Sequence, residues 1–344
     1  MTAKVYINGI GAVTAQGIWR PEIFSEAKAL QQGISPADYP NYRDLIPGAA
    51  LRRMSTGVKM GCYAAKQALL AADQETVEAI ITGTGLGCSI DSDKFLQQIW
   101  ANDEQYLTPT AFIQSTHNTV AAQLALLLGC KGYNMTYVNG ASSFESACLD
   151  ALLQLQAGEL GQVLLGAVDE IATQTYEFLR LAGRIKPDVF PYAEGACFFS
   201  LATQRKASSC AVLVDVELCN QLTTADLGLF VSNFLARQGL QTEDMDALML
   251  GYTGNVQDDA YYAALEEILP HAQALQYKPL SGQYDTCSAF GLAAAAYILK
   301  QQEVHPVLYR DLQQRQSRPD RWKYLLLYHQ YGGKDHALLL LRVC

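Results

Sequence analysis

The sequence predicts an α/β fold in which one unit of strands and helices occurs twice. Short, continuously apolar runs recur along the chain, and helical patterns fall between them. Runs of this length, bounded by glycine or polar residues, are typical of strands buried on both faces of a sheet. Their alternation with helices predicts an α/β architecture with short connections.

The expected elements follow in order along the chain. The strands are KVYINGIGAV, EAIITGTGLG, NMTYVNG (134–140), QVLLGAV, ACFFSLA, AVLVDVEL, ALMLGYTG, KYLLLYH and HALLLLRV. Apolar helical periodicity predicts helices at residues 60–72, 115–129, 143–157, 261–275 and 288–300.

The two halves repeat the same order of elements. In the first half AIITGTGLG precedes a helix of small residues at 143–157, and LLGAVDE and ACFFSLA follow. In the second half ALMLGYTGN precedes SAFGLAAAAYILK, and YLLLYHQYGG and ALLLLRV follow. Glycine and alanine all round a helix make sense only if it is packed on both sides. We therefore expect paired central helices between two sheets, with halves at residues 1–205 and 206–344.

Composition excludes several classes of protein. The chain has 344 residues, half of them hydrophobic, which fits one large or two medium compact units. A formal charge of −9 argues against a nucleic-acid groove. Nine dispersed cysteines without a CxxC pair predict a reducing compartment and no metal cluster. No signal-peptide pattern and no apolar run of about 18–20 residues is present, so we expect a cytoplasmic protein without a membrane span.

Residues 138–158, VNGASSFESACLDALLQLQAG, are predicted to form a strand end, a tight turn and an apolar helix. Many α/β enzymes carry their nucleophile on such a turn. Cys148 lies inside the predicted helix on its apolar face, too far from the helix N-terminus for a lowered pKa, so we interpret it as a core residue. Ser142 and Glu145 have the spacing of a capping box, and the GxSxG elbow is absent, so we interpret Ser142 as a helix cap. The turn carries no evident nucleophile.

A glycine-rich turn after a strand, as in ITGTGLGCSID, could indicate a dinucleotide-binding site. GTGLGC lacks the third glycine at the required place, and no acidic partner for a ribose is evident. We interpret these glycines as positions where backbones approach closely.

The order and spacing of these motifs resemble those of the β-ketoacyl-acyl carrier protein synthases. The motifs that carry the resemblance are VYINGIGAVTAQG, ITGTGLG, STHNTVAAQLALLLGCKGYN, LLGAVDE, EGACFFSLA and YGGKDHALLLL, which together span nearly the whole chain. The resemblance implies the thiolase-like fold, a duplicated five-layer α/β/α/β/α arrangement.

Active members of that family use a cysteine on the nucleophile turn and two histidines from the second half. The cysteine holds the acyl chain, and the histidines help to decarboxylate a malonyl unit and to stabilise the enolate. The resemblance places Ala141 at the cysteine and Gln283 at the second histidine, and the first histidine motif, residues 251–259, contains no histidine. His329 and His336 flank the C-terminal glycine loop near this site, and we interpret both as structural.

The resemblance therefore implies a chain-length factor, the non-catalytic β subunit of a type II polyketide ketosynthase. KPDVFPYAEGA and SGQYDT are most similar to the subtype of aryl polyene and flexirubin-type pigment pathways, although many chain-length factors carry glutamine where this chain has Ala141. The expected partners are an active, fatty-acid-synthase-like ketosynthase, in a heterodimer that uses the strand at 134–140, and an acyl carrier protein. We expect no cofactor of its own, because the carrier protein brings the phosphopantetheine. The expected tunnel residues are Leu86, Ile90, Phe95 and Phe112.

Two alternatives remain open at this point. One is an active thiolase-fold acyltransferase or malonyl decarboxylase that uses Ser142, Ser143 or a histidine. The other is a scaffold that docks acyl carrier protein without defining a tunnel.

Overall fold

Two matching sets of five strands build the fold within the described part of the chain. The structure is a computed structural model that describes residues 3–31, 33–52, 54–185, 191–311 and 321–344. The first set is β1 (Val5–Thr14), β4 (Ala79–Gly83), β5 (Tyr133–Tyr137), β6 (Gln162–Asp169) and β8 (Gly195–Ala202). The second set is β9 (Ala211–Asn220), β10 (Ala247–Leu250), β11 (Gln273–Gln276), β12 (Tyr324–Tyr331) and β13 (Asp335–Arg342). Short strands lie outside these sets, namely β2 (Gly17–Ile18), β3 (Ile34–Ser35) and β7 (Tyr192–Ala193).

The helices alternate with these strands. They are α1 (Ile23–Glu26), α2 (Gly48–Leu51), α3 (Thr56–Ala71), α4 (Ser89–Ala101), α5 (Pro109–Ser115), α6 (Thr119–Leu128), α7 (Ser143–Ala157), α8 (Thr173–Leu181), α9 (Leu227–Arg237), α10 (Val256–Ile268), α11 (Lys278–Ser281) and α12 (Ser288–Gln301). Single 3₁₀ turns occur at Tyr42–Asp44, Gly140–Ser142, Thr242–Asp244 and Pro306–Leu308.

The two strand sets have the same topology. The spatial order is β5-β4-β6-β8-β1 in the first and β11-β10-β12-β13-β9 in the second. In each set the three outer strands run parallel and the two inner strands are antiparallel to their neighbours. The sets meet where β1 pairs with β9 over Val5–Ile7. The duplicated arrangement predicted from the sequence is confirmed, while the boundary at residue 205 stays a prediction.

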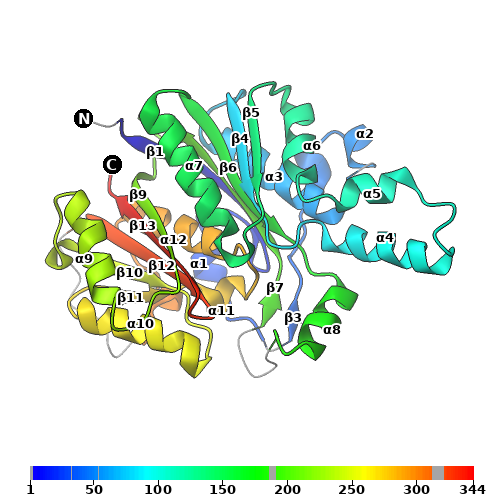
Figure 1. Cartoon of the computed structure of the whole chain (residues 1–344). Helices are drawn as coiled ribbons and strands as arrows, with labels where there is room; N and C mark the ends of the chain where they lie inside the picture. Colours follow the sequence, from blue (N-terminus) through cyan, green and yellow to red (C-terminus); the bar gives the residue numbers. More distant parts are fainter. Residues whose placement is uncertain (1–2, 32, 53, 186–190, 312–320) are drawn as a thin grey trace.

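The central layer consists of α7 and α12, which pack between the two strand sets (Figure 1). Helices α3 and α6 cover the outer face of the first set, and α9 and α10 cover that of the second. The small residues of α12 are needed here, because a Cβ atom at Gly291 would lie 2.9 Å from the Tyr277 ring and 3.1 Å from Leu327. The predicted five-layer α/β/α/β/α fold is therefore confirmed.

One predicted helix is wrong at its C-terminal end. The pattern at 261–275 predicts a single helix, but α10 ends at Ile268 and residues 273–276 form the edge strand β11 beside β10. Pro270 cannot continue the helix, and the apolar residues after it satisfy a buried strand as well as a helix. The predicted helix at 115–129 likewise begins later, at Thr119.

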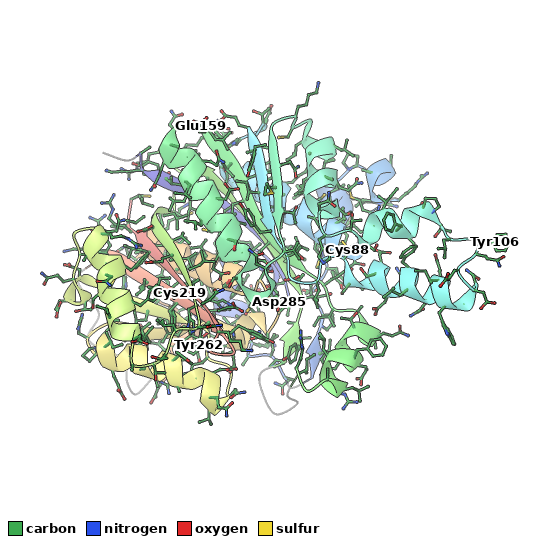
Figure 2. All side chains as sticks on the ribbon, viewed as in Figure 1. Cys88, Tyr106, Glu159, Cys219, Tyr262 and Asp285 are labelled. Carbon is green, nitrogen blue, oxygen red and sulfur yellow. The ribbon has the colours of Figure 1, made fainter. Side chains whose placement is uncertain are left out.

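Helices α4 and α5 form an arm that projects from the body of the molecule (Figure 1). Thr108 donates a hydrogen bond to Gln98 over 2.9 Å, and the Phe95 and Phe112 rings lie 5.5 Å apart, so the arm is held by its own contacts. Trp100 and Tyr106 on the arm are 86% and 90% exposed, and Figure 2 shows Tyr106 at the far end.

No helix in the described residues is long and apolar enough to cross a membrane. Across the same residues, no group of three or more His, Cys, Asp or Glu side chains is arranged to hold a metal ion. All nine cysteines are free thiols, and most of them are buried.

Candidate functional site

Ala141 occupies the turn between β5 and α7 that the sequence marks as a nucleophile position. Gly140 has a φ of +56°, a conformation that glycine adopts without strain, and α7 begins at Ser143 after a 3₁₀ turn. Ala141 is almost fully buried, and its side chain is an unreactive methyl group.

The capping box predicted for this turn is wrong. Ser142 is the N-cap residue, but its side chain makes no capping hydrogen bond. The Ser143 hydroxyl instead accepts a hydrogen bond from the Asn139 N–H over 2.8 Å and donates one to the Gly140 carbonyl over 2.6 Å. Ser142 ends the 3₁₀ turn with φ −96° and ψ 10°, not in the extended conformation that is typical of a capping residue, and Glu145 is buried in the interior.

Cys148 has the structural role that its place in the helix predicts. Its side chain is fully buried among the residues of the central layer. Burial raises the pKa of its thiol, so the group stays protonated at neutral pH.

Neither Gln283 nor the 251–259 segment, the positions that the resemblance matches to two histidines, supplies an imidazole. Gln283 is buried after α11, and its main chain exchanges hydrogen bonds with Pro191 and Ala193. In the 251–259 segment, a Cβ atom added at Gly251 would lie 2.7 Å from the Tyr277 hydroxyl oxygen and 2.8 Å from that of Tyr262. Two tyrosine hydroxyls therefore fill the space beside the backbone there.

A buried polar cluster lies behind the Ala141 turn, made of Glu145, Lys278, Ser288 and His329. The Glu145 carboxylate oxygens, Lys278 Nζ, Ser288 Oγ and His329 Nε2 are enclosed and have no hydrogen-bond partner of normal geometry among the described residues. His329 Nδ1 lies 3.0 Å from the Tyr277 hydroxyl. The cluster draws its members from α7, α11, α12 and β12, so both halves contribute.

Burial dominates the ionisation of this cluster. It raises the pKa of Glu145 to about 7, against the opposing effects of Ser288 and the Lys278 ammonium. It also lowers the pKa of Lys278. Burial, with Lys278 acting in the same direction, lowers the pKa of His329 to about 3, while the main chain of Ala141 opposes that shift. His329 is therefore a neutral imidazole beside the turn at pH 7.

His336 is structural, as expected. Its Nδ1 lies 2.8 Å from the Tyr328 hydroxyl, and its ring packs at 4.9 Å from that of Tyr261. Burial lowers its pKa.

Two buried carboxylates fix the loops around the turn. Asp169 accepts hydrogen bonds from the Thr84 hydroxyl and the Gly85 and Leu86 N–H groups, and from both the N–H and the hydroxyl of Thr286. It thus ties the glycine-rich turn of the first half to the start of α12 in the second. Burial raises the pKa of Asp169, and these hydrogen bonds oppose the shift.

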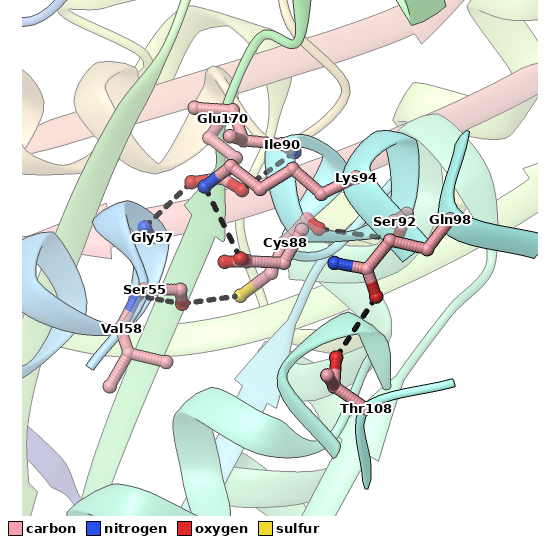
Figure 3. A network of polar contacts seen from close by, with 11 residues as sticks. Ser55, Gly57, Val58, Cys88, Ile90, Ser92, Lys94, Gln98, Thr108 and Glu170 are labelled. Atoms are coloured by element: carbon pink, nitrogen blue, oxygen red, sulfur yellow. Dashed lines mark hydrogen bonds and ion pairs between the residues drawn. The ribbon is translucent and has the colours of Figure 1, made fainter. Parts of the chain in front are cut away.

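Glu170 performs a similar role on the other side of β6. It accepts hydrogen bonds from the Gly57 N–H over 2.7 Å and the Ile90 N–H over 2.9 Å, which joins the starts of α3 and α4 (Figure 3). Burial raises its pKa to about 7.

The glycines of ITGTGLG serve close packing, as the sequence predicts. A Cβ atom at Gly83 would lie 2.5 Å from the Ser143 carbonyl oxygen, and one at Gly85 would lie 1.9 Å from Asp285 Oδ2. Both distances are far below van der Waals contact, so larger residues are excluded at these positions.

A cavity of about 300 Å³ opens beside Ala141. Leu86, Ala141 and Ile185 contribute to its apolar wall, and Gln283 lies at its margin. A second cavity of about 250 Å³ adjoins it and shares Gln283 and Tyr331.

Of the four predicted tunnel residues, only Leu86 lines the cavity beside Ala141. Ile90 and Phe95 lie on α4, and Phe112 lies on α5 with 55% of its surface exposed. Their role in a tunnel stays a prediction. No local pattern marks Glu145, Lys278 and Ser288 as neighbours, because the three helices that carry them, α7, α11 and α12, are separate in the chain.

Comparison with known proteins identifies the family. The family model of the β-ketoacyl synthase N-terminal domain matches residues 26–226, more than half of the chain. A search of curated proteins finds no match.

Solved structures share the fold over the whole chain. The ishigamide ketosynthase/chain length factor has a TM-score of 0.82 at 17% identity, covering 100% of both chains. A β-ketoacyl synthase from Burkholderia phymatum STM815 has a TM-score of 0.84 at 16% identity, covering 99% of this chain and 100% of that one. The ketosynthase ApeO in complex with its chain length factor ApeC, from Xenorhabdus doucetiae, has a TM-score of 0.78 at 15% identity, covering 99% and 98%. With its thiolase-like fold and the match over residues 26–226, this chain belongs to the β-ketoacyl synthase family.

Proposed function

We propose that this protein is a non-catalytic chain-length factor, which pairs with an active ketosynthase and bounds the acyl tunnel in type II polyketide or polyene biosynthesis. The observation that carries the proposal is Ala141 at the start of α7. A methyl group has no lone pair with which to attack a thioester, so an acyl chain cannot be held there covalently.

The surroundings of Ala141 support the same conclusion. Decarboxylation of a malonyl unit requires groups that stabilise a developing enolate within reach of the substrate. Tyrosine hydroxyls fill the space at Gly251, and Gln283 has a neutral amide that cannot act as an acid or base. His329 is fully enclosed and does not line the cavity.

The edge strand β5 supports a partner chain. Among the described strands β5 pairs only with β4, so its outer edge is open, and Met135 on it is exposed. Leu126 and Leu153 are also exposed, and they belong to α6 and α7, the two helices that contact β5. An open edge flanked by apolar side chains is prone to association, and pairing with a second chain removes that liability.

We propose an active ketosynthase as that partner, in a heterodimer, and an acyl carrier protein that brings the phosphopantetheine, so that this chain needs no cofactor. Solved structures with the same fold include a ketosynthase with its chain length factor, and a type II acyl-carrier protein in complex with its ketosynthase. The resemblance of KPDVFPYAEGA and SGQYDT further supports an aryl polyene or flexirubin-type pathway in the cytoplasm.

The tunnel would lie where the arm meets the partner. Phe95 and Phe112 contact each other on the arm, yet Phe112 is half exposed in the single chain. Such a pair can close a tunnel only after a second chain covers it. Leu86 lines the cavity, and Ile90 lies between Leu86 and Phe95 in the sequence, which supports a role for both in the same wall.

One observation favours the alternative of a non-cysteine acyltransferase or decarboxylase. His329 Nε2 is unpartnered among the described residues, and the main chain of Ala141 affects its pKa. The hydroxyl of Ser143, the other candidate, is already engaged with Asn139 and Gly140.

Intact-mass spectrometry separates the two functions. The purified chain, alone and with the ketosynthase encoded beside it, is incubated with acyl- and malonyl-carrier protein. We expect acylation of the ketosynthase only, in a stable one-to-one complex. A stoichiometric acyl adduct on this chain, or decarboxylation of the malonyl group by the chain alone, would support the enzyme instead. A chain that stays monomeric with the ketosynthase would contradict the heterodimer.

A further inference from the structure

The cavity beside Ala141 has a lining that acyl binding does not explain. Four tyrosines line it, namely Tyr176, Tyr192, Tyr284 and Tyr331, together with the carboxylates of Asp285 and Asp335. An acyl chain needs only apolar walls. Aromatic rings combined with carboxylates favour a different class of ligand.

The rings form a corner rather than a flat wall. Tyr176 on α8 and Tyr192 on β7 have ring centroids 5.8 Å apart and ring planes at 71°. In this edge-to-face contact the edge of one ring lies against the face of the other, and both rings line the cavity. The negative face of an aromatic ring attracts a cation within about 6 Å of the centroid, and corners of this kind are used to bind alkylammonium groups.

Carboxyl groups outnumber cationic side chains in the described lining of the cavity. Asp285 and Asp335 form no salt bridge with any described residue, and the buried Asp169 and Glu170 also line the cavity. Arg184 is the one cationic side chain among the described lining residues, and it is exposed to solvent. Solvent screens Arg184 more strongly than it screens the carboxylates inside.

Asp285 is held in place by the fold. Its carboxylate rests on the backbone of Gly85, where a Cβ atom would lie 1.9 Å away, and Figure 2 shows it at the junction of the two halves. Burial, and the neighbouring Asp169, raise the pKa of Asp285 to about 7, while Arg184 opposes the rise. A cation in the cavity would offset both causes.

From this geometry we infer that the cavity beside Ala141 binds a small organic cation, an ammonium group carried on an apolar or aromatic body. Its volume of about 300 Å³ lies at the lower end of ligand pockets and suits one compact molecule. The ammonium would lie between Asp285 and Asp335, and the apolar body would rest against the Tyr176–Tyr192 corner. The inference goes beyond the chain-length role and does not depend on it, since the cavity is formed by this chain alone.

The test uses three probes of similar size and different charge. They are 2-phenylethylamine, 2-phenylethanol and 3-phenylpropionate, measured by isothermal calorimetry and ligand-observed NMR on the purified chain and on its complex with the ketosynthase. We expect saturable binding of the amine, at least tenfold weaker binding of the alcohol, and no binding of the carboxylate. Binding of the alcohol or the carboxylate as tightly as the amine would overturn the inference, as would the absence of binding by all three.

Variants locate the site. Asp285→Asn should weaken binding of the amine at least tenfold and change binding of the alcohol less than twofold. Asp103→Asn, the same substitution on the projecting arm, is the matched control and should change neither. If Asp285→Asn does not fold, Asp335→Asn at the start of β13 serves instead. Amine binding that survives both substitutions would overturn the inference.

Pantetheine is included as a neutral competitor. Displacement of the amine by pantetheine at lower concentration than the amine itself requires would show that the cavity prefers the carrier arm, and the inference would be wrong. Neither result bears on whether the chain pairs with a ketosynthase, because association is measured separately by sedimentation.

Discussion

Replacing Glu145 by glutamine should change how the stability of the protein depends on pH. Glu145 is fully enclosed on α7, and burial raises its pKa from 4.5 to about 7. Lys278 on α11 and Ser288 on α12 oppose the rise, Asp335 on β13 adds to it, and the neutral His329 on β12 lies in the same cluster. The carboxylate is therefore protonated more readily in the folded chain than in the unfolded one.

The sign and size of the effect follow from that shift. A folded-state pKa above the unfolded value contributes stability that is complete below about pH 4.5 and is lost as the pH rises through about 7. At 1.36 kcal/mol per pKa unit, the loss amounts to about 3 kcal/mol between pH 4.5 and pH 8. Glutamine cannot ionise, so Glu145→Gln lacks this loss. Its amide donors carry a constant cost at every pH.

The assay is urea unfolding at pH 5, 6, 7 and 8, followed by circular dichroism, with each variant in the same oligomeric state. The free energy of unfolding of Glu145→Gln minus that of the parent should rise with pH by about 2–3 kcal/mol over this range. Glu159→Gln, the same substitution at an exposed residue just after α7, is the matched control. A difference that stays constant within about 0.5 kcal/mol from pH 5 to pH 8 would refute the reasoning.

Three further predictions concern the site and the arm. Ala141→Cys should gain a thiol at the start of α7 that iodoacetamide alkylates, yet no condensing activity should appear in a carrier-protein assay, because no histidine pair is present. Gly251→Ala should lower stability by about 1–3 kcal/mol, since its methyl group meets two tyrosine hydroxyls, whereas Gly48→Ala, which meets nothing within 4 Å, should not, as thermal melting will show. Phe112→Ala and Leu86→Ala, tested separately, should lengthen the products of the reconstituted complex, and unchanged chain lengths at full complex stability would exclude these residues from the tunnel wall.

The layered fold was predictable because it rests on patterns local to each element. Continuous apolar runs identify strands covered on both faces, and the all-round small residues of 288–300 indicate a helix enclosed between sheets. The error at β11 shows the limit of that reasoning. Residues 273–276 are compatible with either structure, and only the neighbouring strand β10, distant in sequence, decides between them.

The candidate site was predictable only in part. Ala141 and Gln283 follow from the order of motifs, and the absence of a histidine at 251–259 can be counted directly. The cluster of Glu145 and Lys278 gives no comparable signal. A glutamate in the first turn of a helix is typical of a helix cap, and a lysine before a proline is typical of an exposed loop. Both are buried because α7 and α11 converge from the two halves, which no local pattern records.

Under the proposed function, the turn keeps its framework without catalytic side chains, and the hydrogen bonds explain how. Asp169 accepts five hydrogen bonds from the two halves, and Gly83 packs directly on the main chain at the start of α7. None of these contacts involves a nucleophile or an imidazole. Catalytic side chains commonly cost stability, so under the proposed function a methyl group at Ala141 and an amide at Gln283 would not weaken the scaffold.

Two surface features of the described chain need a partner to cover them. The open edge of β5 and the exposed aromatic residues of the arm are unfavourable in water, and a single chain gains nothing by keeping them. The proposed function accounts for both features, because a partner chain would cover them. Substitutions on β5 or the arm should therefore impair the complex more than substitutions at Ala141, and that order of effects distinguishes a chain-length factor from an enzyme.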